Sequence, residues 1–268
     1  MESKFNVKTI FAGIVIPTAF VVSVLIYIFF LGSSSNFEGG DNHNNPLPGN
    51  YFGVVYKGGV IVPLIMTLLL IVITFCIERF LTIRKAKGLG NTNIFLAKIQ
   101  NHLNAKQINE AVALCGEQQG SLANVIICGL NKYNEVAVDA DLERNEKVTA
   151  IQKEIEEATA LELPSLEQNL VFLSTIASVA TLMGLLGTVL GMIRAFAALA
   201  TAGAPDSVAL ATGISEALVN TALGISTSAL AIIAYNYFTT QIDKITFSID
   251  EAGFSIVQNF AATHHGKK

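Results

Sequence analysis

Polar side chains recur along the apolar segment 214–238. At 100° per residue, Glu216, Asn220, Thr221 and Thr227 fall within one arc of about 140° on a helix. A carboxylate at the centre of a bilayer costs at least about 2.5–3.5 kcal/mol, and such residues commonly serve a function. Glu216 is therefore a candidate functional residue. The alternative is that Glu216 lies close enough to the outer face of the membrane to reach water.

The apolar segment 167–200 carries a second stripe. Small and hydroxyl-bearing residues follow one another there at spacings of three and four, on one side of a helix: Thr181, Gly184, Thr188 and Gly191. Gly187 and Gly191 also form a small-xxx-small pair, which lets helix backbones approach closely, and Gly224 lies on the polar arc of the later segment. The stripe predicts a face turned toward protein or water. The alternative is a plain packing helix.

An arginine and a glutamate are expected at matching depths in these two segments. If the first segment runs outward and the second returns, Arg194 and Glu216 both lie in the outer half of the membrane. We expect them to pair, within one subunit or between subunits. Our hypothesis is that this ion pair fixes the register of the two helices.

The residue types limit the chemistry of these stripes. Several chains in a ring could line a lumen with the hydroxyls of Thr188 and Thr221, but a hydroxyl cannot take up and release a proton near neutral pH. If the assembly moves protons, the titrating group is expected from another protein inside the ring. No nucleophile–base pair, phosphate-binding loop or metal-ligand cluster accompanies the stripes, so we expect neither an enzyme nor a bound cofactor or metal.

The composition agrees with a membrane protein. The 268 residues have a mean hydropathy of +0.52, with 51% hydrophobic and 14% charged residues. The net charge of −4 argues against nucleic acid as a partner. Three scattered cysteines suggest neither a disulfide framework nor a zinc site.

The apolar segments predict an all-α, polytopic membrane protein with four spans, whose long helices extend into a cytoplasmic helical domain. The first segment could be a signal peptide, but its length favours a retained span. A cluster of basic residues, Arg79 to Lys87, follows the second span and places that end, and both termini, in the cytoplasm. The expected parts are a first span with an external loop, a second span, a cytoplasmic domain, two pore-lining spans and a C-terminal helix with its tail: 1–58, 59–84, 85–166, 167–240 and 241–268. A short external turn, 202–206, is expected between the two pore-lining spans, and the tail 264–268 is expected to be solvated. The apolar residues of the C-terminal helix are expected on roughly one face: Ile242, Ile245, Ile249, Ile256 and Phe260.

Two motifs carry a resemblance to a known family. They are Gly184-Leu-Leu-Gly-Thr-Val-Leu-Gly-Met192, and Ile214-Ser-Glu-Ala-Leu-Val-Asn-Thr-Ala-Leu-Gly224 followed by Tyr235-Asn236. Together they resemble the ExbB/TolQ/MotA proton-channel family, and within it ExbB. The resemblance implies a homopentamer in the lipid of the bacterial inner membrane. The ring would surround a single-span, ExbD-like partner whose aspartate carries the proton, and it would drive a TonB-like protein that opens outer-membrane transporters.

By motif position, Thr188 and Thr221 match the pore threonines of the family, and Glu216 matches its important glutamate. Thr181 and Thr227 would add hydroxyls to the pore. The chain departs from the family in its additional first span, and in having Thr181 and Leu230 where relatives often have proline. A TolQ-like envelope motor and a non-conducting membrane scaffold remain as alternatives, and so does sodium in place of the proton.

Overall fold

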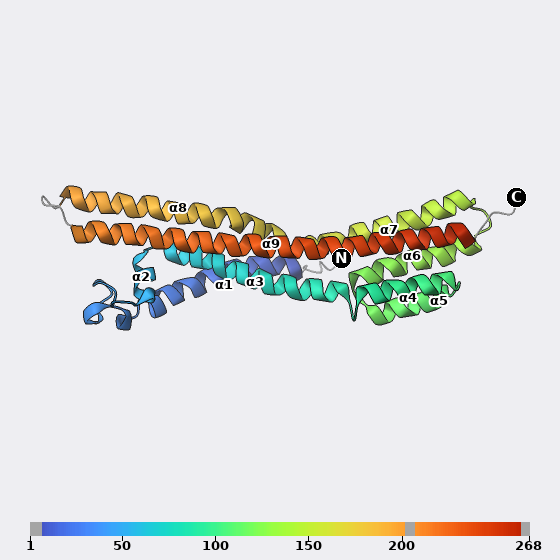
Figure 1. Ribbon diagram of the computed structural model, residues 1–268, viewed down its shortest axis with the longest axis horizontal. Coiled ribbons are helices and arrows are strands. Elements are labelled where there is room, and N and C mark those ends of the chain that lie inside the picture. Colours follow the sequence, from blue (N-terminus) through green and yellow to red (C-terminus); the bar gives the residue numbers. More distant parts are fainter. Residues whose placement is uncertain (1–6, 202–206, 264–268) are drawn as a thin grey trace, which may run out of the picture. The chain divides into compact units, whose positions relative to one another are not determined.

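The structure is a computed structural model that describes residues 7–201 and 207–263 (Figure 1). Within these ranges all regular elements are helical, and four helices are long and apolar enough to span a membrane, which confirms the predicted all-α, four-span class. The predicted external turn 202–206 and the solvated tail 264–268 lie outside the described residues.

The chain divides into two compact units. Unit 1 comprises Met1–Ile77 and Asn169–Asn236, and unit 2 comprises Glu78–Gln168 and Tyr237–Lys268. Helices α3 (Ile61–Lys87) and α9 (Ser207–Thr263) contribute to both units. Each unit is described below by itself.

Unit 1 holds the membrane helices. Helix α1 (Val7–Leu25) continues as a π-helical segment (Ile26–Leu31), and α8 spans Leu170–Thr201. Contacts along α3 hold the others in place. The Ser23 hydroxyl of α1 donates to the Pro63 carbonyl, and the Phe75 ring stacks on Phe172 of α8 at 4.8 Å between centroids. The additional first span therefore packs against α3.

The segment 32–58, which we call the cap, is more ordered than the predicted loop. It contains two short 3₁₀ turns (Ser34–Asn36 and Glu38–Gly40) and helix α2 (Tyr51–Lys57). Asn36 organises it, because its buried amide nitrogen donates to the Phe30 and Leu31 carbonyls. The Tyr27 ring of the π-helical segment stacks on Tyr56, with centroids 4.7 Å apart. These side-chain bonds could not be read from the Asn-, Gly- and Pro-rich composition alone.

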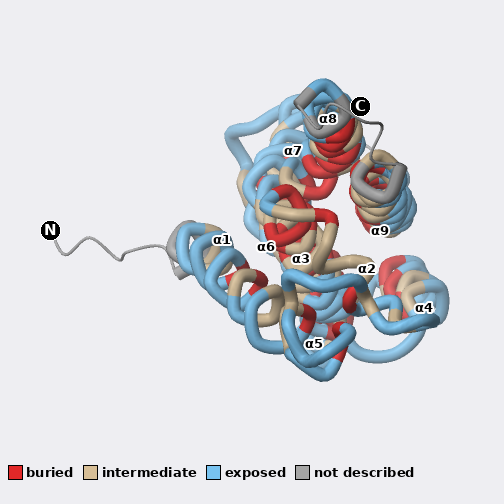
Figure 2. Tube along the Cα trace, turned by 90° about the vertical axis from the view of Figure 1, so that its left-hand side faces the viewer, coloured by how far each residue is buried: buried red, intermediate tan, exposed pale blue. Residues whose placement is uncertain are grey.

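Unit 2 is a helical domain. It consists of the ends of α3 and α9 together with α4 (Thr92–Asn104), α5 (Ile108–Gln118), α6 (Gly120–Val138) and α7 (Arg144–Glu167). Figure 2 colours each residue by its burial; on α4 the buried residues Phe95, Ile99 and Leu103 recur every four residues along one side of the helix. The apolar face predicted for the chain's last helix is buried: Ile242, Ile245, Ile249, Ile256 and Phe260. That helix is not separate from the fourth span, because α9 is continuous over 57 residues.

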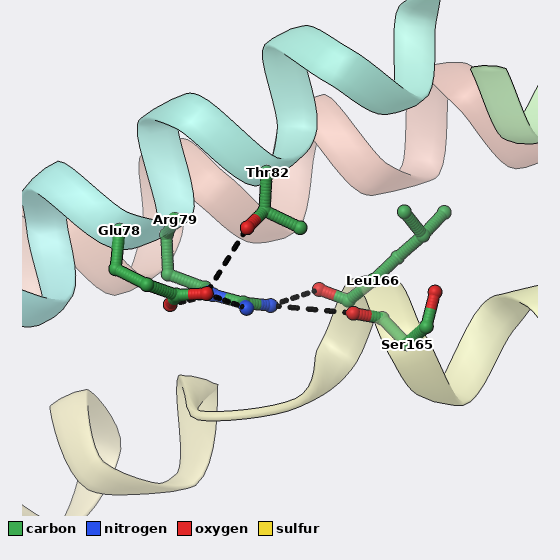
Figure 3. A network of polar contacts seen from close by, with 5 residues as sticks. All are labelled: Glu78, Arg79, Thr82, Ser165 and Leu166. Carbon is green, nitrogen blue, oxygen red and sulfur yellow. Dashed lines mark hydrogen bonds and ion pairs between the residues drawn. The ribbon is translucent and has the colours of Figure 1, made fainter. Parts of the chain in front are cut away.

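A buried arginine donates hydrogen bonds to the C-terminal end of α7 (Figure 3). Arg79 is 1% exposed, and its guanidinium pairs with the Glu78 carboxylate, which also accepts from the Thr82 hydroxyl at 3.0 Å. The same guanidinium donates to the Leu166 carbonyl at 3.0 Å. The last carbonyls of a helix lack intrahelical partners, so Arg79 satisfies a group that α7 leaves open.

Candidate functional site

A seam of small residues joins α8 to α9 in unit 1. Gly184, Gly187 and Gly191 are buried on α8 and face α9, where Gly224 is buried in turn. A Cβ added at Gly224 would lie 2.6 Å from the Ala180 carbonyl oxygen and 2.8 Å from the Gly184 Cα. The two backbones therefore approach more closely than any larger side chain would permit. The structure places these four glycines in a contact within one chain.

Asn220 lies at the centre of this seam. Its side chain occupies the notch opened by Gly187, where an added Cβ would lie 2.4 Å from the Asn220 Cβ. Asn220 is 2% exposed, and its amide nitrogen donates to the Gly58 carbonyl at 2.8 Å. This hydrogen bond connects the last residue of the cap to the α8–α9 pair.

The candidate threonines differ in exposure. Thr221 is half-buried and donates to the Gly184 carbonyl at 3.2 Å, across the seam. Thr188 is half-buried and donates to the Leu185 carbonyl at 2.6 Å, within α8. Thr181 is exposed, whereas Thr227 is buried. The open side of the helix pair thus carries Thr181 and Thr188, with Thr221 between the seam and the surface.

Glu216 lies one turn before Asn220, at a groove beside the cap. Its Oε2 lies 3.9 Å from the Arg194 Nη1, within one chain. The groove has a volume of about 490 Å³, and Lys57 of the cap and Ser215 of α9 line it together with Glu216. The Lys57 ammonium donates to the His43 carbonyl at 3.0 Å.

Two structural contributors were not singled out from the sequence. Gly58 supplies the carbonyl that Asn220 binds, and Gly213 packs on Ala195, with an added Cβ 2.7 Å from the Ala195 Cβ. Gly213 continues the small-residue spacing of α9 one turn before Ala217, which was a usable signal. No signal in the sequence pointed to Gly58, because it acts through its backbone carbonyl, and every residue has one.

A comparison with protein families gives one match. The sequence model of the MotA/TolQ/ExbB proton channel family matches residues 117–251, about half of the chain. The match includes all of α7 and α8 and the site residues of α9. Helix α1 and the cap lie outside it.

Similar proteins carry two kinds of name. The chain is 42% identical over 84 residues to the Tol-Pal system protein TolQ of Haemophilus influenzae, covering 31% of this chain and 37% of that protein. It is 27% identical over 129 residues to TolQ of Pseudomonas aeruginosa (48% and 56%). It is 25% identical over 163 residues to the biopolymer transport protein ExbB of Pseudomonas putida (60% and 48%). The chain thus spans less than two thirds of each of these relatives.

Proposed function

Because the chain belongs to the MotA/TolQ/ExbB proton channel family, we propose that it is the ring-forming subunit of a proton channel and motor. Five copies would enclose a single-span, ExbD-like partner in the bacterial inner membrane. The partner's carboxylate would carry the proton, and its motion would pass to a TonB-like protein that opens outer-membrane transporters. The basic cluster after the second span supports cytoplasmic termini.

The observation that carries the proposal is the placement of hydroxyls on the α8–α9 pair. Thr188 and Thr221 are half-buried beside a tight seam, in helices that lie within the family match. Each hydroxyl bonds a backbone carbonyl and keeps acceptor lone pairs for a proton donor. In a ring of copies, these oxygens would stabilise a protonated carrier without taking up the proton themselves.

The test replaces the hydroxyls and measures proton flux. In vesicles containing the purified complex, we expect Thr188→Val and Thr221→Val each to lower flux by at least about tenfold, because the shape is kept but the acceptor is lost. Thr74→Val in α3 is the matched control, since the Thr74 hydroxyl, like that of Thr188, bonds a carbonyl within its own helix. Native mass spectrometry of the same samples checks that five copies still assemble around the smaller partner.

The outcomes separate the alternatives. Unchanged flux in both threonine variants would favour a non-conducting scaffold, and a monomer without a partner would remove the ring altogether. A sodium gradient that drives flux in place of the proton gradient would change the ion. A second candidate function is a TolQ-like role in the cell envelope, which the relatives named TolQ favour. The identity of the co-purified periplasmic protein, TonB-like or Tol-Pal, decides between the two.

A further inference from the structure

One face of α9 in unit 2 carries two exposed phenylalanines. Phe247 is 69% and Phe254 is 64% exposed. Together with Lys244 and Asp250 they recur at spacings of three and four, on one side of the helix. We call these four residues the α9 strip. Exposed aromatic rings on a folded domain are candidates for an interaction site.

Lipid does not account for this exposure. Lys244 and Asp250 are exposed on the strip itself, and Asp243 and Glu251 are exposed beside it. Charged side chains facing hydrocarbon are costly, so this part of α9 lies outside the bilayer. A protein surface that offers apolar contact and charges of opposite sign would therefore cover the rings.

The same unit carries such a surface. A hollow of about 350 Å³ lies between α4 and α5, and we call it the α4–α5 hollow. Leu89 and Ile94 line it and are themselves 63% and 58% exposed. Its charged lining residues are Lys98 on α4 and Glu117 on α5. The hollow thus presents apolar side chains together with one cation and one anion.

The strip and the hollow lie at the same level along unit 2. Lys87 fixes this level, because its ammonium donates to Gln241 at 2.6 Å while its carbonyl accepts from Gln118 at 3.1 Å. Glu117 therefore lies level with the stretch that leads to Lys244. Farther along, Phe247 lines one hollow with Thr92 and Asn93 at the start of α4, next to Ile94.

The charges follow in matching order from that level. On the strip, Asp250 lies three residues beyond Phe247, a rise of about 4.5 Å. On α4, Lys98 lies four residues beyond Ile94, a rise of about 6 Å. Along the strip the order is therefore cation (Lys244), ring (Phe247) and anion (Asp250). Along the hollow it is anion (Glu117), apolar side chain (Ile94) and cation (Lys98).

We propose that the α9 strip of one copy docks into the α4–α5 hollow of the next copy, with Phe247 against Ile94, Lys244 against Glu117 and Asp250 against Lys98. A contact between two different patches of the same chain is heterologous and repeats around a closed ring. The inference rests on the proposed ring, and it assigns the contact by which neighbouring copies recognise each other outside the membrane.

The experiment is disulfide cross-linking between two differently tagged versions of the full chain, co-expressed with the small membrane proteins of neighbouring genes. The background replaces Cys76, Cys115 and Cys128 by alanine. One version carries Phe247→Cys and the other Ile94→Cys, so only an intermolecular disulfide can join the two tags. The matched control pairs Ile94→Cys with Leu161→Cys, since Leu161 is 82% exposed on α7 but lies outside the strip.

We expect a cross-linked heterodimer with Phe247→Cys and at least about tenfold less with the control. Adding Asp250→Lys to the first version sets two cations against each other and should lower the yield by at least about tenfold. Adding Lys98→Asp to the second version should then restore most of it, because the pair is attractive again in reversed order. Rescue of this kind requires that the two side chains face each other.

The outcomes keep the inference apart from the proposed function. Rings of five copies that give no Phe247–Ile94 cross-link, or no rescue by the exchanged charges, would overturn the docking contact and leave the channel proposal standing. A cross-link from Phe247→Cys to a cysteine placed in the single-span partner would assign the strip to that partner and also overturn the contact. The absence of any ring in native mass spectrometry would remove the proposed function, and the docking contact with it.

Discussion

At the scale of single residues, the α8–α9 seam depends on glycines, which have no side chain and so let the two helix backbones approach closely. Gly224 faces backbone atoms, the Ala180 carbonyl oxygen and the Gly184 Cα, so no side-chain rotation can make room there for a methyl group. Gly187 differs, because what fills its notch is the side chain of Asn220. The seam thus contains one position closed by backbone and one closed by a partner residue.

Gly224→Ala is expected to lower the free energy of unfolding by about 1–3 kcal/mol, because the added methyl group forces the two helices apart. Gly13→Ala in α1 is the matched control, since an added Cβ there meets nothing within 4 Å. Chemical unfolding of the purified protein in detergent measures both variants. Equal unfolding midpoints for Gly224→Ala and Gly13→Ala would contradict the close approach.

Much of this seam was predictable from spacing. The recurrence of Gly184, Gly187 and Gly191 indicated a helix that permits close approach. Spacing could not show whether the approaching backbone belongs to the same chain or to a neighbour, because both satisfy the same pattern. Nor could it separate Asn220, which turns inward to the Gly58 carbonyl, from Thr221, which is only half-buried one residue later.

At the scale of elements, the end of α7 depends on Arg79 from another helix. The guanidinium bonds the Ser165 and Leu166 carbonyls while pairing with Glu78, and all of these groups lie within unit 2. A buried ion pair of this kind is weak evidence for net stability, because desolvation opposes the attraction. Removing Arg79 is different, because the buried Leu166 carbonyl then loses the donor that satisfies it.

Arg79→Met is expected to lower the free energy of unfolding by about 1–3 kcal/mol, since the Leu166 carbonyl at the end of α7 loses its buried donor. Arg84→Met serves as the control, because Arg84 is exposed one turn and a half farther along α3 and should change stability by no more than about 0.5 kcal/mol. Hydrogen exchange in the last turn of α7 provides a local readout. Equal exchange in the two variants would show that the guanidinium does not hold this turn.

The elements were predictable to different degrees. Apolar length and basic flanks identified the four spans, and apolar residues at helical spacing identified the buried face of the chain's last helix. Long helices that extend beyond the membrane were predicted, but 241–268 was taken as a separate helix, although no glycine or proline interrupts 225–252 and so nothing in that stretch ends a helix. The role of Arg79 was missed because its spacing to Leu166 is set by the fold and not by any local pattern.

At the scale of the whole molecule, the cap and the seam are coupled within unit 1. Asn220 donates to Gly58, and Gly58 directly follows helix α2 of the cap. The coupling is a buried hydrogen bond between a segment outside the family match and a helix inside it. The family pattern alone could not reveal it, because one of its two groups belongs to the additional N-terminal part.

Asn220→Ala is expected to speed amide hydrogen exchange in helix α2 by roughly threefold to twentyfold, corresponding to the loss of a hydrogen bond worth about 0.6–1.7 kcal/mol. Asn101→Ala in unit 2 is the control, because Asn101 is exposed. Mass spectrometry of peptides covering 51–57 gives the measurement. Unchanged exchange in Asn220→Ala would mean that the cap is held by its own contacts, such as the Tyr27–Tyr56 stack.

The notch at Gly187 also constrains how this pair of helices can diverge. The Asn220 side chain fills the space that the missing side chain at position 187 leaves free. A large side chain therefore fits on α8 or on α9, but not on both. A lineage that moved the bulk from α9 to α8 would have to pass through a sequence with either a void or a clash. Positions 187 and 220 are therefore expected to change together or not at all among related sequences. Their covariation would report this packing more directly than either residue does alone.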